Sequence, residues 1–285
     1  MNVRTENKPS YTIHRMNPDE VNLVMSWSAE EGWNPGLKDA ECFYNTDPSG
    51  FFIGKLGGEP IGCITAIAYD ETFGFIGLFL VKKGFRGMGY GISLWEMAME
   101  YLGYRNIGLD GILEQREKYE KSGFHLAFHI LRYSGTVAGK TSSQLVPATD
   151  VPYDQLVEYD QQCFPASRRA FLDCWIQMPQ SLALAHYQNE QIRGYGVIRQ
   201  CINGYKVGPL FADNGEIAEE ILRALAEYSS GQPIALDIPE VNPEGIELLE
   251  NLGLQHRFKT IRMYTEETPE AASSKIFGLT TLRNM

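Results

Sequence analysis

Six residues, Arg86-Gly87-Met88-Gly89-Tyr90-Gly91, have the composition of a loop that binds a phosphate or pyrophosphate. The apolar run 73–81 comes before them and the helical pattern 92–102 comes after, so we expect a strand, a short turn and a helix. Such a turn directs backbone N–H groups and the positive end of a helix dipole at one place. Lys82 and Lys83 add positive charge there. The alternative is a plain strand–helix connection that needs glycine only for its positive φ angles.

Two motifs bear on this choice. Arg86, Gly89 and Gly91 read as Arg-x-x-Gly-x-Gly, whereas the spacings of Walker and dinucleotide-binding loops are absent. Further on, Tyr119-Glu120-Lys121-Ser122-Gly123-Phe124 reads as Tyr-x-Lys-x-Gly-Phe and follows a strand-like segment at 106–110. In this order the two motifs resemble those of the GNAT superfamily of acyl-CoA N-acyltransferases.

The resemblance implies which residues bind acetyl-CoA, the co-substrate. Backbone groups of the strand before the loop would pair with the pantetheine amides, and the loop amides would hold the pyrophosphate. The positions are Phe79, Leu80 and Val81 for pantetheine, and Arg86, Gly87, Met88, Gly89, Tyr90, Gly91 and Ile92 for pyrophosphate. Ile112 stands where the family commonly has an asparagine, although Gln115 lies nearby, and Asn242 keeps that role in the second half of the chain.

Tyr119 is the candidate general acid. The amine acceptor must lose a proton to attack a thioester, and the departing CoA thiolate gains one. In the family pattern this tyrosine lies near the thioester sulfur. The alternative is a purely structural tyrosine at the end of a helix.

The general base is sought in the segment 30–36. The strand before the loop has Phe75 where some family members have a glutamate, whereas Glu31 offers a carboxylate. The resemblance implies that this segment covers the acceptor, so Trp33 and Asn34 are candidate acceptor-binding residues. Two alternatives stay open: Glu31 belongs to a solvated helix end, and water serves as the base.

The chain repeats itself at a nearly constant offset, which indicates duplicated domains. For example, 107–110 matches 234–237, and 131–133 matches 261–264. We therefore predict an α+β protein with two tandem GNAT-like domains, each a mostly antiparallel mixed sheet flanked by helices. The predicted parts are a first domain at 10–135, a linker at 134–143, a second domain at 146–265, and a tail at 266–285 that is at most partly ordered.

The second half lacks the phosphate loop. Asp213 and Glu216 stand where the first half has the segment 82–91, and two carboxylates there would repel a pyrophosphate. Asp213 could equally cap the helix that follows it. We expect one acetyl-CoA site, in the first half, and a degenerate second half that shapes the acceptor pocket.

Composition limits the partners. The 25 basic and 36 acidic residues give a net charge of −11, which disfavours nucleic acid and anionic membranes. The apolar stretches are too short to span a membrane, and the segment 1–10 lacks the apolar core of a signal peptide. The five cysteines, an odd number without a C-x-x-C pair, predict reduced, mostly buried thiols and a cytoplasmic location. They are Cys42, Cys63, Cys163, Cys174 and Cys201.

The sequence thus predicts an acetyl-CoA-dependent N-acetyltransferase that transfers an acetyl group directly to a small-molecule amine. A non-catalytic acyl-CoA-binding sensor is the alternative. His125 and His129 lie in a strand-like segment, so we expect no metal site there. Whether the chain forms a homodimer is left open.

Overall fold

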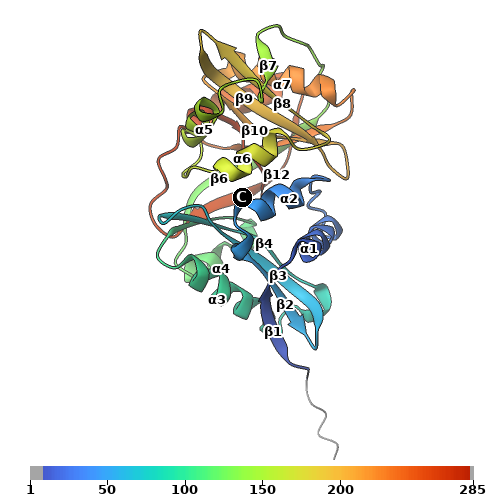
Figure 1. Ribbon diagram of the computed structural model, residues 1–285, viewed down its shortest axis with the longest axis vertical. Coiled ribbons are helices and arrows are strands. Elements are labelled where there is room, and N and C mark those ends of the chain that lie inside the picture. Colours follow the sequence, from blue (N-terminus) through green and yellow to red (C-terminus); the bar gives the residue numbers. More distant parts are fainter. Residues whose placement is uncertain (1–8, 283–285) are drawn as a thin grey trace, which may run out of the picture.

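A computed structural model describes residues 9–282, which form two halves with the same order of elements (Figure 1). The polar segment 1–10 therefore lies mostly outside the described residues. The first half contains β1 (Tyr11–Arg15), α1 (Pro18–Glu30), α2 (Asp39–Thr46), η1 (Pro48–Gly50), β2 (Phe51–Leu56), β3 (Glu59–Ala68), β4 (Phe73–Val81), η2 (Lys83–Phe85), α3 (Tyr90–Leu102), β5 (Asn106–Gly111), η3 (Leu113–Gln115), α4 (Arg116–Lys121) and β6 (His125–Gly135). The second half contains β7 (Leu145–Pro147), α5 (Tyr153–Gln161), α6 (Arg169–Ile176), β8 (Ser181–Gln188), β9 (Gln191–Gln200), β10 (Tyr205–Ala212), α7 (Gly215–Tyr228), β11 (Ile234–Pro239), α8 (Pro243–Asn251), β12 (Gln255–Tyr264), η4 (Ser273–Lys275) and β13 (Ile276–Gly278).

All thirteen strands of the described residues join one mixed sheet. Its order is β1-β2-β3-β4-β5-β12-β6-β11-β10-β9-β8-β7, and β13 pairs with β10. The pairs β4–β5 and β10–β11 are parallel, and the other pairings are antiparallel. The predicted α+β class, with two mostly antiparallel halves flanked by helices, is confirmed.

The two halves exchange their last long strands. β6 belongs to the first half by sequence but pairs with β11, whereas β12 of the second half pairs with β5. β6 and β12 then pair with each other, which makes the sheet continuous where the halves meet (Figure 1). The predicted segments 10–135 and 146–265 therefore do not form separate sheets, because each half is completed by a strand of the other.

Repeated charged residues hold the exchanged strands. Asp110 on β5 is paired with Arg262 on β12, through contacts of 2.5 and 3.0 Å. At the equivalent position of the other half, Asp237 on β11 is paired in the same bidentate way with Arg132 on β6. The Leu-Asp and Arg-Tyr segments that repeat in the sequence thus meet across the halves.

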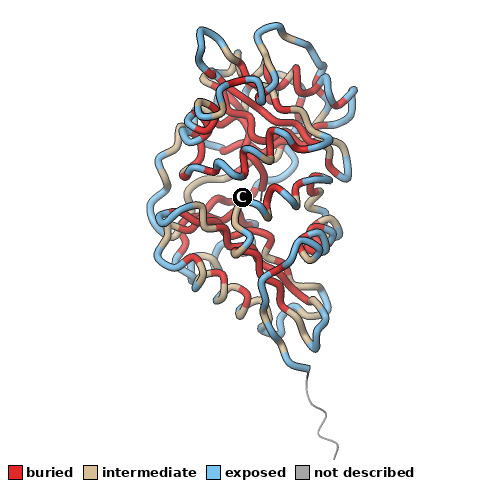
Figure 2. The backbone as a smooth tube through the Cα atoms, viewed as in Figure 1, coloured by how far each residue is buried: buried red, intermediate tan, exposed pale blue. Residues whose placement is uncertain are grey.

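A hydrophobic core extends across both halves. It joins residues of α1 and α2 to residues of α5 and α6, including Phe43 and Trp175, whose rings stack at 5.7 Å. Figure 2 shows buried backbone on the strands and on the helices between the halves. The exchanged strands contribute to the cores on the far side, since Ile261 and Met263 of β12 pack in the first half.

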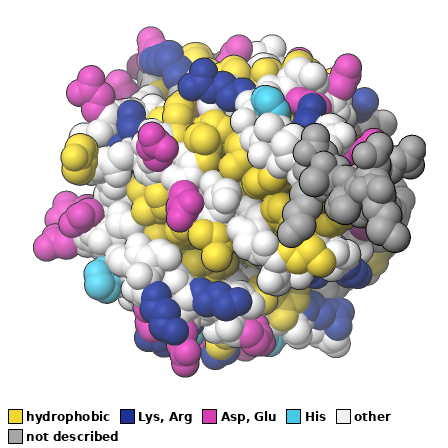
Figure 3. Space-filling model, turned by 90° about the horizontal axis from the view of Figure 1, so that it is seen from below, with side chains coloured by type: hydrophobic (Ala, Val, Ile, Leu, Met, Phe, Trp, Pro, Cys, Tyr) yellow, Lys and Arg dark blue, Asp and Glu magenta, His cyan; other side chains and the backbone are white. Residues whose placement is uncertain are grey.

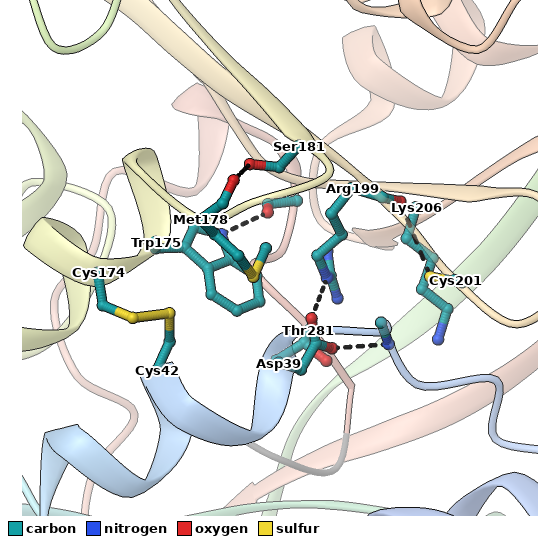
Figure 4. Close-up of polar contacts among 12 residues, drawn as sticks. Asp39, Cys42, Cys174, Trp175, Met178, Ser181, Arg199, Cys201, Lys206 and Thr281 are labelled. Carbon is teal, nitrogen blue, oxygen red and sulfur yellow. Dashed lines mark hydrogen bonds and ion pairs between the residues drawn. A yellow bond between two sulfur atoms is a disulfide. The ribbon is translucent and has the colours of Figure 1, made fainter.

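A disulfide joins the equivalent helices α2 and α6. Cys42 is bonded to Cys174, 132 residues away, and Figure 4 shows this bond beside Trp175. The prediction of reduced cysteines is wrong for this pair, because the repeat brings the two helices together at the junction. The remaining cysteines, Cys63, Cys163 and Cys201, are free and buried as predicted.

The segment after β12 is ordered up to the last described residue, contrary to the prediction for the tail. Within it β13 pairs with β10, and Phe277 is fully buried. Leu279 and Leu282 pack into the core that spans both halves. The polar residues at the start of the tail obscured the apolar group that follows. The predicted linker is also shorter, because Ser134 and Gly135 belong to β6.

Candidate functional site

The loop 86–91 joins β4 to α3 as predicted. Gly87 and Gly89 have φ angles of 78° and 90°, in the left-handed region that glycine adopts readily. Gly89 is the N-cap of α3 and has no side chain with which to cap the helix. The first N–H groups of a helix have no intrahelical partner, so this end can accept an anion.

A groove runs from this loop along β4. The parallel register of β4 and β5 runs from Phe73↔Asn106 to Ile76↔Leu109, after which the strands diverge. Leu78 has a φ of 41°, beside a register shift between β3 and β4, and its carbonyl accepts a hydrogen bond from the Cys63 thiol at 3.1 Å. The β4 residues predicted to meet pantetheine lie beyond the divergence.

Two adjoining cavities form the groove, with volumes of about 420 and 490 Å³. Gly87, Gly89, Gly91 and Ile92 line the second cavity, whereas Leu80 lines the first. The residues that line both cavities are Phe79, Val81, Arg86, Trp95, Gln115, Lys118 and Tyr119. Met88 lies in the loop itself, and Tyr90 is the first residue of α3. The Tyr90 carbonyl accepts a hydrogen bond from the Tyr11 hydroxyl at 3.2 Å.

Tyr119 lies where the two cavities meet. Its ring is 5.8 Å from that of Trp95, between centroids. It covers Gly111 so closely that a Cβ there would be 2.5 Å from a ring carbon. The ring is therefore held in place on two sides, and its role as the acid stays a prediction.

Glu31 reaches the groove but is engaged by the loop. Its carboxylate lies 2.8 Å from Nη2 of Arg86 and 4.0 Å from Nζ of Lys83. Arg86 also donates from Nε to the Val81 carbonyl at 2.7 Å. The Glu31 carboxylate is therefore occupied by the loop, and it could reach an acceptor amine only if Arg86 moved to another partner.

Residues of the second half form hydrogen bonds to the segment that contains Trp33 and Asn34. Trp33 lines the groove, and its carbonyl accepts a hydrogen bond from Lys206 at 3.0 Å. The Asn34 side chain instead exchanges two hydrogen bonds of 2.9 Å with the backbone of Asn203, in the turn between β9 and β10. Asn34 thus supports the segment and does not line the groove.

A buried ion pair anchors the same segment. Asp39 accepts a hydrogen bond from Arg199 of β9 at 2.9 Å, and its other oxygen accepts one from the Gly36 amide at 2.9 Å. Figure 4 shows Arg199 pointing at Asp39, with Lys206 and Cys201 beside them. This supports the idea that the second half shapes the acceptor pocket.

Sequence reasoning missed two features of the groove. Asp110 lines it, and its partner Arg262 comes from the second half. The recurrence of Asp110 as Asp237 and of Arg262 as Arg132 was the available signal. Lys118, the residue directly before Tyr119 on α4, also lines the groove and adds a cation beside the tyrosine.

The family assignment follows from comparison with known proteins. A model described as the acetyltransferase (GNAT) family matches residues 19–124, and one described as an acetyltransferase (GNAT) domain matches residues 156–278. The chain is a tandem GNAT acyltransferase. A holothin acyltransferase of Pseudoalteromonas sp. (strain SANK 73390) is 29% identical to this GNAT protein, over 93% of this chain and 91% of that one.

Other relatives agree with this assignment. An uncharacterized N-acetyltransferase of Bacillus subtilis is 25% identical, over 79% of this chain and 81% of that one. A putative acetyltransferase of Pyrococcus horikoshii has the same fold, with a TM-score of 0.82, 22% identity and coverage of 99% and 97%. A tandem GNAT protein from the clavulanic acid biosynthesis pathway gives a TM-score of 0.63 at 14% identity, with coverage of 91% and 99%.

GNAT proteins use acetyl-CoA or another acyl-CoA, and the groove suits such a molecule. It offers an open helix N-terminus with Arg86 and Lys83 nearby, and a strand edge beyond the divergence of β4 and β5. Residues 9–282 contain no cluster of three or more His, Cys, Asp or Glu side chains that could hold a metal. Across the same residues, no helix is long and apolar enough to cross a membrane. Seen from the first-half end, acidic and basic side chains are mixed around a central apolar area (Figure 3).

Proposed function

We propose that this GNAT protein transfers the acetyl group of acetyl-CoA to an amine of a small molecule. One observation carries the proposal: a continuous groove leads from the glycine-capped end of α3, along the edge of β4, to Tyr119. A pyrophosphate would bind at the loop, and the pantetheine arm would lie along Phe79–Val81. The thioester would then lie near the tyrosine.

Direct transfer requires two proton movements. The amine nitrogen attacks the thioester carbonyl, the carbon–sulfur bond breaks, and the thiolate takes a proton from Tyr119. The Tyr119 hydroxyl would donate its proton as the carbon–sulfur bond breaks, and the resulting phenolate would regain a proton from solvent before the next turnover. Water, or Glu31 after Arg86 has moved to the pyrophosphate, would take the proton of the amine.

The walls of the groove favour an acceptor with an apolar body and a cationic amine. Trp33 and Ile112 supply apolar surface, and the carboxylate of Glu31 would supply negative charge once Arg86 has moved to the pyrophosphate. The holothin acyltransferase is named for an acceptor of its own, so holothin belongs in the set of amines to be tested on this chain.

The test is turnover with acetyl-CoA and a panel of primary amines that includes holothin, polyamines and amino sugars. Thiol release and the mass of the product would be measured. Acetyl-CoA would be compared with longer acyl-CoA molecules. We expect an amine-dependent rate and a product heavier by one acetyl group.

The matched control is Gly89→Asp, which adds bulk and negative charge at the anion site. Loss of charge-assisted hydrogen bonds should weaken acetyl-CoA binding roughly 100-fold. The second-half control, Asn214→Asp at the N-cap of α7, should leave binding unchanged.

The alternative, a non-catalytic acyl-CoA sensor, is favoured by one observation. The candidate base Glu31 is held by Arg86. Tight acetyl-CoA binding without turnover of any amine in the panel would support the sensor.

A further inference from the structure

In the second half, the C-terminal segment that contains β13 occupies the place where the first half has a groove. β10 and β11 pair only at Tyr205↔Ile234 and Lys206↔Ala235 and then diverge, as β4 and β5 do. β13 lies in the gap. It pairs with Leu210 and Phe211 of β10, which the repeat matches to Phe79 and Leu80 of the first half.

Both walls of the gap hold this segment. On the other side from β10, the amide of Leu279 donates to the Asp237 carbonyl of β11 at 2.7 Å. Phe277 is fully buried among residues of α7, α8 and β11. At Gly208 the approach is so close that a Cβ would lie 2.4 Å and 2.3 Å from the carbonyl oxygens of Leu279 and Thr280.

A buried amide binds the backbone of the segment. Nδ2 of Asn242 donates to the carbonyls of Ile276 at 3.0 Å and Ser274 at 3.4 Å, while its Oδ1 caps α8 at the Gly245 amide. Asn242 is the asparagine that the family resemblance placed beside pantetheine. In this half its partner is a peptide.

The charge at the end of the gap is reversed relative to the first half. Asp213 lies between β10 and α7, where the first half has its basic loop, and it accepts a hydrogen bond from Lys275 of the segment at 2.9 Å. Arg193 and Tyr159 also bind the Asp213 carboxylate. Asp213 therefore does not cap α7; Asn214 does, by accepting a hydrogen bond from the Ile217 amide at 3.0 Å.

We propose that the second half has become a strand-binding site, and that its ligand is residues 275–280 of the chain itself. The ligand class is an extended peptide with a lysine followed by buried apolar residues. The edge of β10 pairs with the backbone of the peptide, and the side-chain amide of Asn242 donates to two of its carbonyls. The carboxylate of Asp213 binds its lysine. The comparison of this site with the groove for the pantetheine arm rests on the proposed function of the first half. The contacts of residues 275–280 do not depend on that proposed function.

The first test separates the ligand from its site. The chain ending at residue 267 would be titrated against a fluorescein-labelled peptide of residues 268–282, and anisotropy would be measured. We expect saturable one-to-one binding. A peptide carrying Phe277→Ser should bind at least roughly 100-fold more weakly, the scale for loss of a fully buried ring.

A charge control tests the lysine. Lys275→Glu in the peptide should weaken binding roughly tenfold, because it places a carboxylate against Asp213. The same change at the exposed Lys140 of the full chain should leave thermal stability unaltered. Absence of peptide binding by a folded truncated chain would overturn the proposal.

The second test uses the full chain and decides the matter if the truncated chain does not fold. Gly208→Ala should displace the segment, so the amide of Leu279 should exchange with solvent at least tenfold faster. Gly84→Ala is the matched control, because a Cβ there meets nothing within 4 Å. Unchanged exchange at Leu279 in Gly208→Ala would overturn the proposal.

Acetyl-CoA calorimetry completes the design. The truncated chain should bind one molecule, as we expect for the full chain, because Asp213 and the Asn214 cap are unsuited to a pyrophosphate. Binding of two acetyl-CoA molecules to the truncated chain would show that the second half still accepts the cofactor. This result would overturn the proposal that residues 275–280 are the ligand of the second half. The peptide and exchange tests require neither acetyl-CoA nor an amine, so a failure of the proposed function would not affect them.

Discussion

The two halves share a scaffold but treat the start of one helix differently. The N-cap of α3 is Gly89, which leaves the first N–H groups of that helix open. The N-cap of α7 is Asn214, whose side chain accepts a hydrogen bond from one of the first N–H groups. Next to the first helix lies Arg86, and next to the second lies Asp213. A change of cap and of one charge would therefore separate the proposed anion site from the proposed strand-binding site.

A second comparison concerns how the halves stay together. Each half supplies the strand that completes the other, and each exchanged strand carries an arginine for a buried aspartate. The two pairs differ in exposure: the side chains of Arg262 and Asp110 are 7% and 0% exposed, against 11% and 5% for Arg132 and Asp237. The more deeply buried pair lies under the groove of the first half.

Breaking that pair should give the largest effect. Arg262→Leu removes the arginine that is paired with the buried Asp110 carboxylate, which should lower the free energy of unfolding by about 3–5 kcal/mol. Urea denaturation followed by fluorescence would measure it. The double variant Asp110→Leu/Arg262→Leu should recover most of the loss, because a buried ion pair is often replaceable by apolar residues. A loss of under about 1 kcal/mol in the single variant would show that Asp110 is solvated.

Removing the link between the equivalent helices should cost less. The double variant Cys42→Ser/Cys174→Ser opens a covalent loop that restricts the unfolded chain, so the free energy of unfolding should fall by about 2–4 kcal/mol. Reductant should lower the stability of the parent chain toward that of the variant and leave the variant unchanged. Equal stability of the two proteins without reductant would mean that the thiols are not joined in solution.

Local patterns predicted the parts of the site that lie close together in sequence. The loop 86–91 and the helix after it were readable because a strand, glycines and an amphipathic helix follow one another directly. The repeat revealed the two halves because the matched segments keep their order along the chain.

Features that depend on distant partners were not readable. Arg132 and Arg262 occupy equivalent positions, so the sequence gives no sign of which aspartate each one meets, and the strand exchange was missed. Cys42 and Cys174 pair only because α2 and α6 meet at the junction. Glu31 was predicted from its position in a loop, and its ion pair with Arg86 depends on how that loop folds back.

Tyr119 distinguishes the first half from the second, because the repeat places the fully buried Leu249 at the same position and leucine has no proton to donate. A variant of Tyr119 therefore tests the chemistry proposed for the first half. Tyr119→Phe removes only the hydroxyl, so packing against Trp95 and Gly111 should persist. We expect kcat to fall roughly 10²-fold, with little change in the affinity for acetyl-CoA. Single-turnover kinetics with the best amine of the panel would measure it. An unchanged chemical step would assign the proton to water.

The smallest expected effect concerns Lys206, which the repeat matches to Phe75. Phe75 packs under the guanidinium of Arg262, at 4.9 Å, whereas Lys206 lies near Arg132. Burial, and then the positive charge of Arg132, lower the pKa of Lys206 to about 8; Arg199 acts in the same direction, and Cys201 and Asp237 oppose it. A cation in this position is thus less favourable than the phenyl ring of the other half.

The sign of the pH dependence follows from the two pKa values. The unfolded chain holds this proton up to about 10.5 and the folded chain only up to about 8, so between these values the unfolded state binds more protons and the free energy of unfolding rises with pH. Lys206→Met removes this titrating group. The contributions of the other titrating groups cancel when the free energy of unfolding of the variant is subtracted from that of the parent chain. The stability of the parent chain relative to the variant should therefore rise by about 2 kcal/mol between pH 7.5 and 10, measured by urea denaturation. A difference that stays flat would mean that Lys206 is solvated in the folded state. Its hydrogen bond to the Trp33 carbonyl would then be too weak to hold the segment 30–36.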